Sequence, residues 1–278
     1  MQQSLHLISG LIITVLLSSC TSISTMQQRT LAVEQIVSAR GWQSQIIATS
    51  FFDLMSYRPA LHQSKHLTVY IEGDGLAWLT SRQVSSNPTP TNPLVLKMAL
   101  KDASNSSIYI ARPCQYVTGK HIKNCNKKYW TSHRFSTVVI EAMNDAITQL
   151  KHSFQAKEFT LVGYSGGGAI ATLVAARRDD VVKLITVAGN LDHQAWTDYH
   201  NISPLTGSLN PADYQASLSA IEQIHFVGEN DKIIPPFLAQ LFVDELPANS
   251  KSKVIVVPGQ THSDCWDDVW PELLSIIE

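Results

Sequence analysis

A serine flanked by glycines follows a short apolar run near the middle of the chain. The run Phe159–Val162 leads into Gly163-Tyr164-Ser165-Gly166-Gly167, and helix-forming residues continue from Ala169 to Arg177. A strand, a sharp turn and a helix in this order would hold the Ser165 hydroxyl exposed at the tip of the turn. The Gly166 amide, which opens the helix, would point to where a tetrahedral oxyanion forms. The alternative is a glycine-rich turn with a serine of no function, but the apolar residues on both sides favour a nucleophile.

A serine hydroxyl is a weak nucleophile at neutral pH, so Ser165 needs a base within hydrogen-bond reach and an acid that orients the base. His262 comes shortly after the apolar run 253–257, and Asp231 comes shortly after the run 221–227. The carboxyl ends of parallel strands share one edge of a sheet, where residues far apart in sequence converge. The order Ser, Asp, His therefore predicts a catalytic triad at that edge.

Apolar runs alternate with helical patterns along most of the chain, which predicts an α/β fold. We expect a mainly parallel twisted sheet with helices on both faces and right-handed crossovers. Residues 193–219 lose this periodicity and gather aromatic residues and prolines, which is typical of an inserted lid-like segment. The expected strands are 44–52, 66–71, 107–111, 159–162, 181–187, 221–227 and 253–257, and the expected helices are 94–100, 134–150, 169–177, 237–246 and 264–277.

In the order of these elements and in three motif positions, residues 44–278 resemble the α/β-hydrolase family. The resemblance implies Ser165 as nucleophile, His262 as general base and then acid, and Asp231 as the carboxylate that fixes the histidine tautomer. It also implies Asp192 as an alternative acid, because some members place the carboxylate after the preceding strand. His193, His200 and His225 are expected to be structural or lid residues.

The activity that this resemblance implies is a serine-dependent carboxylic ester hydrolase that forms an acyl-enzyme and uses no cofactor. Two alternatives stay open: a peptidase or amidase with the same triad, and a non-catalytic binding lipoprotein of the same fold. Aromatic residues are candidates for an apolar acyl pocket. These are Trp78, Trp130, Tyr164, Trp196 and Tyr199.

The second oxyanion donor is expected in the loop after the run 66–71, where many relatives carry His-Gly and this chain has Glu72-Gly73-Asp74-Gly75. The Asp74 amide is the candidate donor, although the segment also fits a simple tight turn. Acidic side chains next to an oxyanion would raise its energy unless they point away or pair with a cation. The candidate cations are Arg112, Lys120 and Arg134.

The N-terminal residues 5–17 form an apolar run that is too short for a comfortable membrane span and is typical of a signal peptide. The run ends in Leu17-Ser18-Ser19-Cys20, which resembles a bacterial lipoprotein signal with Cys20 as the lipidated residue. No Lys or Arg precedes the run, so cleavage without lipidation or an uncleaved anchor stays open. The chain thus resembles uncharacterised exported lipoprotein hydrolases of bacteria. We expect a signal peptide over 1–19, a flexible tether over 20–40 and one hydrolase domain over 41–278 on the periplasmic or outer-membrane side of the cell envelope.

Export places the other cysteines in an oxidising compartment, where Cys114 and Cys125 are expected to form a disulfide and Cys265 to stay free. A formal net charge of −2 gives no basic field for nucleic acid. The histidines and cysteines lack metal-ligand spacing, so we expect no metal site. The composition leaves the oligomeric state open.

Overall fold

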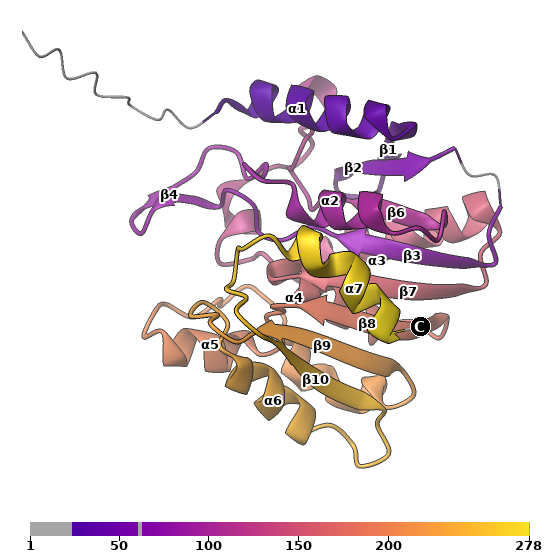
Figure 1. Ribbon diagram of the computed structural model, residues 1–278. Helices are drawn as coiled ribbons and strands as arrows, with labels where there is room; N and C mark the ends of the chain where they lie inside the picture. Colours follow the sequence, from indigo (N-terminus) through magenta and orange to yellow (C-terminus); the bar gives the residue numbers. More distant parts are fainter. Residues whose placement is uncertain (1–23, 61–62, 278) are drawn as a thin grey trace, which may run out of the picture.

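The computed structural model describes residues 24–60 and 63–277, and the lipidation candidate Cys20 and the signal segment 1–19 lie outside them. A twisted eight-stranded sheet runs through the domain in the order β1-β2-β6-β3-β7-β8-β9-β10 (Figure 1). The six strands β6, β3, β7, β8, β9 and β10 pair in parallel with their neighbours. At the other edge, β2 pairs antiparallel with both β1 and β6. The bounds are β1 (Trp42–Ala48), β2 (Asp53–Pro59), β3 (His66–Ile71), β6 (Ser107–Ile110), β7 (Glu158–Tyr164), β8 (Val181–Val187), β9 (Glu222–Gly228) and β10 (Ser252–Val257).

Helices cover both faces of the sheet, because the continuously apolar parallel strands must be shielded from water on two sides. One core cluster contains buried side chains of α3, α4 and α6, and the other contains those of α1, α2 and α7. In Figure 1, α7 lies in front of the sheet and α3 lies behind it. The helices are α1 (Met26–Ala39), α2 (Leu94–Lys101), α3 (Thr137–Phe154), α4 (Gly166–Ala175), α5 (His193–Tyr199), α6 (Pro236–Asp244) and α7 (Trp266–Ile277).

The predicted α/β fold with its mainly parallel sheet is confirmed, and most of the expected elements occur within a few residues of their predicted bounds. The strand β2 was not predicted. It follows β1 after a turn of a few residues, and the two pair from Trp42 with Pro59 to Ala48 with Asp53. Between β3 and α2, where no strand was predicted, a small hairpin of β4 (Trp78–Thr80) and β5 (Gln83–Val84) occurs.

The predicted flexible tether is wrong for residues 26–39, which form helix α1. A capping box begins the helix: the Thr25 hydroxyl accepts from the Gln28 amide, and the Gln28 side chain accepts from the Thr25 amide. Val33 and Val37 are buried against the sheet, and the Arg29 guanidinium donates to a carbonyl of the loop before α2. The segment carries little apolar periodicity because only one short stripe of it contacts the core.

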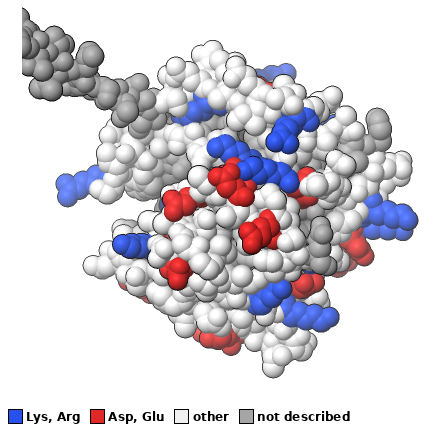
Figure 2. Space-filling view, in the orientation of Figure 1, with Lys and Arg blue, Asp and Glu red and all other residues white. Residues whose placement is uncertain are grey.

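The expected lid-like segment 193–219 contains α5 and a 3-10 helix over Pro211–Leu218, and it is inserted between β8 and β9. Among the described residues, no helix combines the length and apolarity needed to cross a bilayer. Lysine and arginine side chains are interspersed with aspartate and glutamate on the face shown in Figure 2, which agrees with the small formal net charge.

The predicted disulfide between Cys114 and Cys125 is confirmed, with a Cα–Cα distance of 5.6 Å, and Cys265 is free and exposed. The bridge closes a loop that contains one short 3-10 turn, Gly119–His121, and residues 118–120 and 122–124 of this loop are exposed and bury little apolar surface. The loop therefore depends on the cross-link for much of its order.

Replacing both bridged cysteines, as Cys114→Ala with Cys125→Ala, should lower the free energy of unfolding by about 3 kcal/mol, because the unfolded chain gains loop entropy. Urea denaturation under oxidising conditions measures this difference. The exposed Cys265→Ala is the matched control and should change stability by less than about 0.5 kcal/mol. Equal stability of the oxidised and reduced wild type would contradict the prediction.

Candidate active site

Ser165 lies in the turn between β7 and α4 with φ 52° and ψ −120°, a left-handed conformation that costs a non-glycine residue about 1–3 kcal/mol. Two backbone hydrogen bonds to residues at the end of β8 hold it there: the Ser165 amide donates to Val187 O at 3.0 Å, and the Asn190 amide donates to Ser165 O at 3.1 Å. The first turn of α4 passes directly over β3, so that a Cβ on Gly167 would overlap the carbonyl of Ile71. The turn therefore needs glycine beside the serine.

Ser165, His262 and Asp231 form one chain of hydrogen bonds. The His262 Nε2 lies 3.0 Å from Ser165 Oγ, and the His262 Nδ1 lies 2.8 Å from Asp231 Oδ2. The other oxygen, Asp231 Oδ1, accepts from the amides of Ile233 and Ile234, each at 2.8 Å. Because an ionised carboxylate only accepts, the proton lies on Nδ1 and Nε2 is left to accept from the serine hydroxyl.

The parallel register of β9 and β10 brings Asp231 and His262 together. Gly228 at the end of β9 pairs with Val257 at the end of β10, and the two loops that follow are joined by a hydrogen bond from the Asn230 amide to Gln260 O at 2.9 Å. The loop of His262 is also held from the nucleophile side, since the Tyr164 hydroxyl donates to His262 O at 2.8 Å. The three groups are thus positioned by backbone contacts between adjacent strand ends.

Asp192, the alternative acid, caps helix α5 and does not contact His262. Its Oδ1 accepts from the amides of Gln194 and Ala195 at 3.0 and 3.1 Å and so caps the N-terminus of α5. The same oxygen accepts from the Asn210 side chain at 2.8 Å. The structure therefore brings Asp231 rather than Asp192 to the histidine.

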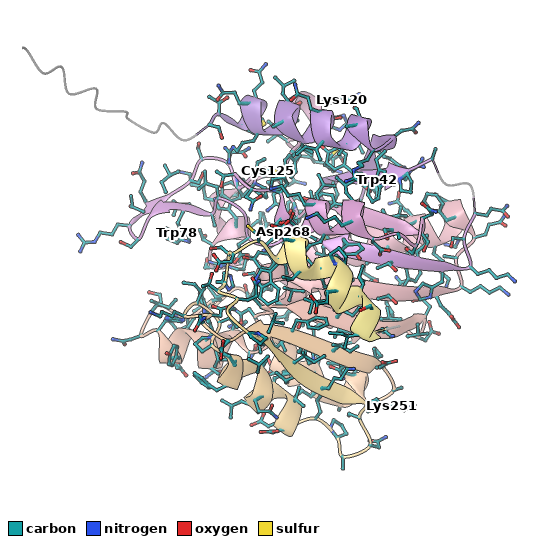
Figure 3. The ribbon with its side chains drawn as sticks, in the orientation of Figure 1. Trp42, Trp78, Lys120, Cys125, Lys251 and Asp268 are labelled. Atoms are coloured by element: carbon teal, nitrogen blue, oxygen red, sulfur yellow. A yellow bond between two sulfur atoms is a disulfide. The ribbon has the colours of Figure 1, made fainter. Side chains whose placement is uncertain are left out.

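Asp74 lies next to the first turn of α4, at the place expected for the second oxyanion donor. Its carboxylate is paired with two cations: Arg112 Nη1 contacts Oδ1, and Arg134 Nη1 lies 2.6 Å from Oδ2. Arg112 Nη2 also donates to Arg134 O at 2.9 Å, which joins the two arginines. We call Asp74, Arg112 and Arg134 the arginine–aspartate cluster. The third candidate, Lys120, is exposed and projects from the top of the molecule in Figure 3.

The arginine–aspartate cluster carries two positive charges and one negative charge, so its formal net charge is +1. Burial raises the pKa of the Asp74 carboxyl, but the charges of Arg134 and Arg112 outweigh burial and leave that pKa below its ordinary value. Asp74 is therefore ionised and neutralised at neutral pH. The Asp74 amide donates to no other described residue, and the Gly166 amide has no acceptor within its helix.

Glu72, the other acidic residue of this loop, points away from the serine. It is 2% exposed, its Oε1 accepts from the Gly73 amide at 2.9 Å, and its Oε2 accepts from the Tyr109 hydroxyl at 3.0 Å. Burial raises the pKa of the Glu72 carboxyl to about 7, although these hydrogen bonds partly offset it. Glu72 thus carries less charge near the site than an ordinary glutamate would.

A cleft of about 940 Å³ opens above Ser165 and His262. Trp78, Tyr164 and Trp196 line it, as the sequence predicted, while Trp130 is buried and donates to Ser85 O, and Tyr199 packs on Phe237 outside the cleft. Polar and apolar side chains share the walls. The remaining lining residues are Asp74, Gly75, Ala77, Ser81, Thr131, Ser132, Arg134, Asn190, Asn201, Ile202, Ser203, Pro204, Leu205, Ile233 and Ile234.

Two features of the cleft were not predicted from the sequence. Asn190 is buried and its Oδ1 has no hydrogen-bond partner among the described residues, so this side-chain oxygen is available to accept from a bound molecule. Helix α5 is fastened to the loop of Asp231, because Trp196 Nε1 and His200 Nε2 each lie 2.8 Å from Ile233 O. An asparagine after an apolar run carries no pattern that would single it out, and the contacts of α5 with Ile233 join segments that are far apart in the sequence.

His193 and His225, which were expected from the sequence to be structural or lid residues, are both buried. His225 is fully buried with its Nδ1 2.8 Å from the Thr186 hydroxyl, and burial lowers its pKa to about 3. His193 is buried beside Phe135, and burial lowers its pKa as well. Within residues 24–60 and 63–277, no three His, Cys, Asp or Glu side chains are grouped so as to hold a metal ion.

The raised pKa of Glu72 makes stability depend on pH. Between the ordinary value of 4.5 and about 7 the folded state holds the Glu72 proton more tightly than the unfolded state, so the free energy of unfolding falls as pH rises through this window. Glu72→Gln should remove a fall of about 3 kcal/mol between about pH 5 and about pH 8. Urea denaturation at both pH values measures it. Glu222→Gln, at an exposed carboxylate, should keep the wild-type profile, and the same profile in Glu72→Gln would contradict the assignment.

No protein-family model matches the sequence, and no curated protein matches it. Solved structures match the fold. A puromycin-hydrolysing peptidase of Mycobacterium tuberculosis has a TM-score of 0.60 at 14% identity over 85% of this chain, which spans 38% of the peptidase. A serine hydrolase homologue of Coxiella burnetii has a TM-score of 0.55 at 17% identity over 84% of this chain and 95% of that one. An esterase of Pyrococcus furiosus has a TM-score of 0.55 at 11% identity over 86% and 92%. The chain therefore has the α/β-hydrolase fold.

Proposed function

We propose that the protein is a serine hydrolase that cleaves carboxylic esters of an acyl or lipid-like substrate through an acyl-enzyme. The observation that carries the proposal is the hydrogen-bonded series Asp231, His262 and Ser165 at the floor of an open cleft. A strained serine, a histidine within hydrogen-bond distance of it and a buried carboxylate on the other ring nitrogen have no shared structural purpose. Together they are the parts that activate a hydroxyl group for acyl transfer.

In the proposed reaction, His262 Nε2 takes the Ser165 hydroxyl proton while Oγ attacks the ester carbonyl carbon. Asp231 stabilises the imidazolium that forms through its hydrogen bond to Nδ1. The histidine then gives its proton to the departing alkoxide, which diffuses away as an alcohol. The acyl group remains bound to Ser165 as an ester. A water molecule repeats the sequence with His262 as base, which releases the acid and restores the serine.

The negative charge of the tetrahedral intermediate would lie between the Gly166 and Asp74 amides, with the dipole of α4 behind the first of them. The acidic loop is compatible with this charge because Arg112 and Arg134 more than neutralise Asp74. Both arginines approach the same carboxylate from the side of the disulfide loop. The arginine–aspartate cluster would thus supply positive charge beside the oxyanion, at the position where many relatives carry His-Gly.

Amide hydrolysis is the second candidate, because the fold is shared with a puromycin-hydrolysing peptidase as well as with an esterase. Turnover of a p-nitrophenyl ester compared with the matching p-nitroanilide distinguishes the two candidates, and a clear preference for the anilide would overturn the ester proposal.

Wild-type protein should react covalently with a fluorophosphonate probe and hydrolyse short p-nitrophenyl esters, since only an activated hydroxyl attacks the phosphorus. Ser165→Ala and His262→Ala should each lower kcat by about 10⁴- to 10⁶-fold, because members of a triad act as a unit. Asp231→Ala should lower kcat by a somewhat smaller factor. Mass spectrometry of the probe adduct and steady-state kinetics measure these effects.

The matched control is Asp192→Ala, which removes the cap of α5 but leaves the carboxylate partner of His262 in place. A larger loss of kcat in Asp192→Ala than in Asp231→Ala would move the acid role to Asp192. A folded, disulfide-bonded wild type that takes no probe would favour a non-catalytic binding protein instead.

We also propose that the chain is exported and anchored through lipidated Cys20, on the basis of the apolar run 5–17 and the Leu-Ser-Ser-Cys that ends it. The neutral Thr21 favours an outer membrane if the host has one. Cys20→Ala should leave the protein unprocessed or release it from membranes. Intact-mass measurement and membrane fractionation test this. The same mass and the same membrane retention in Cys20→Ala as in the wild type would contradict the proposal.

A further inference from the structure

Large apolar side chains are exposed on both sides of the cleft mouth. They come from the β4–β5 hairpin on one side, and from α5, the segment after it, the loop before α6 and the first turn of α6 on the other. Each is between 37% and 54% exposed, and apolar side chains that gather around one opening, unlike singly scattered ones, indicate a surface that contacts a ligand, a partner or a membrane. We call this set the apolar rim: Trp78, Leu79, Tyr199, Ile202, Ile233 and Phe237.

The apolar rim is continuous with the cleft. Trp78, Ile202 and Ile233 line the cleft and are exposed as well, so each extends from its wall to the outer surface. On the outer side, the rings of Tyr199 and Phe237 are 5.1 Å apart in an edge-on contact. A ligand or surface that covers the rim therefore also covers the entrance to Ser165.

The apolar rim is held rigidly, which favours docking over closure. Ile233 O accepts from Trp196 and His200 of α5, so the two elements of one side are fastened to each other. On the other side, a hydrogen bond from Ser85 N to Ala77 O at 3.0 Å closes the base of the hairpin, and the buried Trp130 Nε1 donates to Ser85 O at 3.2 Å. The exposed side chains thus stay apart, on opposite sides of an open mouth.

Charges near the apolar rim do not oppose contact with an anionic surface. The rim segments 76–84, 196–205 and 232–237 contain Arg82, Lys232 and Asp198, two positive charges and one negative charge, for a formal sum of +1 with His200 neutral. Figure 2 shows mostly uncharged surface toward the left of the view, with isolated basic and acidic side chains. Exposed aromatic residues with a few basic neighbours are typical of proteins that lie on a bilayer surface.

The start of helix α1 lies on the same side of the molecule as the apolar rim. In Figure 1, the N-terminal end of α1, the β4 hairpin and α5 all lie toward the left of the view, and Trp78 projects on that side in Figure 3. The proposed lipid anchor precedes α1 by only a few residues in the sequence. A bilayer that held the anchor would therefore be within reach of the rim.

We infer that the apolar rim docks on the surface of a phospholipid bilayer and that the cleft takes acyl esters directly from it. The substrate class is then a water-insoluble acyl lipid rather than a freely dissolved ester. This substrate assignment rests on the proposed hydrolase function, whereas the docking surface does not.

Environment-sensitive fluorophores at two positions test the docking. Leu79→Cys places one in the apolar rim, and Ile276→Cys places a control at a 49% exposed residue near the C-terminal end of α7, which lies away from β4 and α5 in Figure 1. Both changes are made in the full chain with Cys20→Ser and Cys265→Ser, so that only the disulfide cysteines remain besides the label. Vesicles of phosphatidylcholine and phosphatidylglycerol that carry a quencher in the acyl region should quench the probe at 79 several-fold and leave the probe at 276 unchanged.

Activity provides the second readout. The double variant Leu79→Ser with Phe237→Ser, at two rim residues that do not line the cleft, should hydrolyse a vesicle-embedded ester several-fold more slowly and a soluble p-nitrophenyl ester at the wild-type rate. Ile276→Ser should behave like the wild type with both substrates.

The two failures are distinguishable. Equal quenching of both probes, or quenching of neither, would overturn the docking surface even if the soluble ester is turned over. A change at 79 that grows with protein concentration without vesicles would identify a second copy as the occupant and overturn it too. Selective quenching at 79 in a protein that cleaves no ester would support the docking surface and overturn the hydrolase.

Discussion

The close crossing of α4 over β3 is the constraint on which the site depends. Because Gly167 lies directly against the Ile71 carbonyl, the chain must turn sharply after β7, and Ser165 is the residue at the turn. The strain of its left-handed backbone is balanced by hydrogen bonds to the end of β8. The same crossing places the amide of Gly166 beside the loop after β3. One packing contact thus fixes the candidate nucleophile and both candidate oxyanion donors relative to each other.

A second contact connects this centre to the disulfide loop. Asp74 follows β3, Arg112 follows β6, and Arg134 lies beyond the bridged cysteines, yet the three side chains meet in one cluster. Taking such charges out of water is costly and is offset only when every charge is paired and hydrogen-bonded. Here one carboxylate is shared by two guanidinium groups, and the excess positive charge lies where the proposed reaction develops a negative one.

The outer wall of the cleft is attached to the loop that carries Asp231. Asp231 Oδ1 holds the amide of Ile233, and the carbonyl of Ile233 in turn accepts from Trp196 and His200 of α5. The segment expected to behave as a lid is therefore anchored to the residue that orients His262. This arrangement leaves the mouth open and the apolar rim exposed, which suits substrates presented at a surface better than substrates enclosed by a closing lid.

The sequence by itself determined the features that depend on local pattern: the strand–turn–helix around Ser165, the alternation that produces a parallel sheet, the order Ser, Asp, His, and the bridge between Cys114 and Cys125. Only the tertiary structure decided between Asp231 and Asp192, because both follow a parallel strand and the difference lies in which carboxylate caps a helix and which reaches the histidine. Strand β2 and helix α1 were missed for a related reason. Each is stabilised by pairing or packing against distant residues, and such contacts leave little periodicity in the sequence of the segment itself.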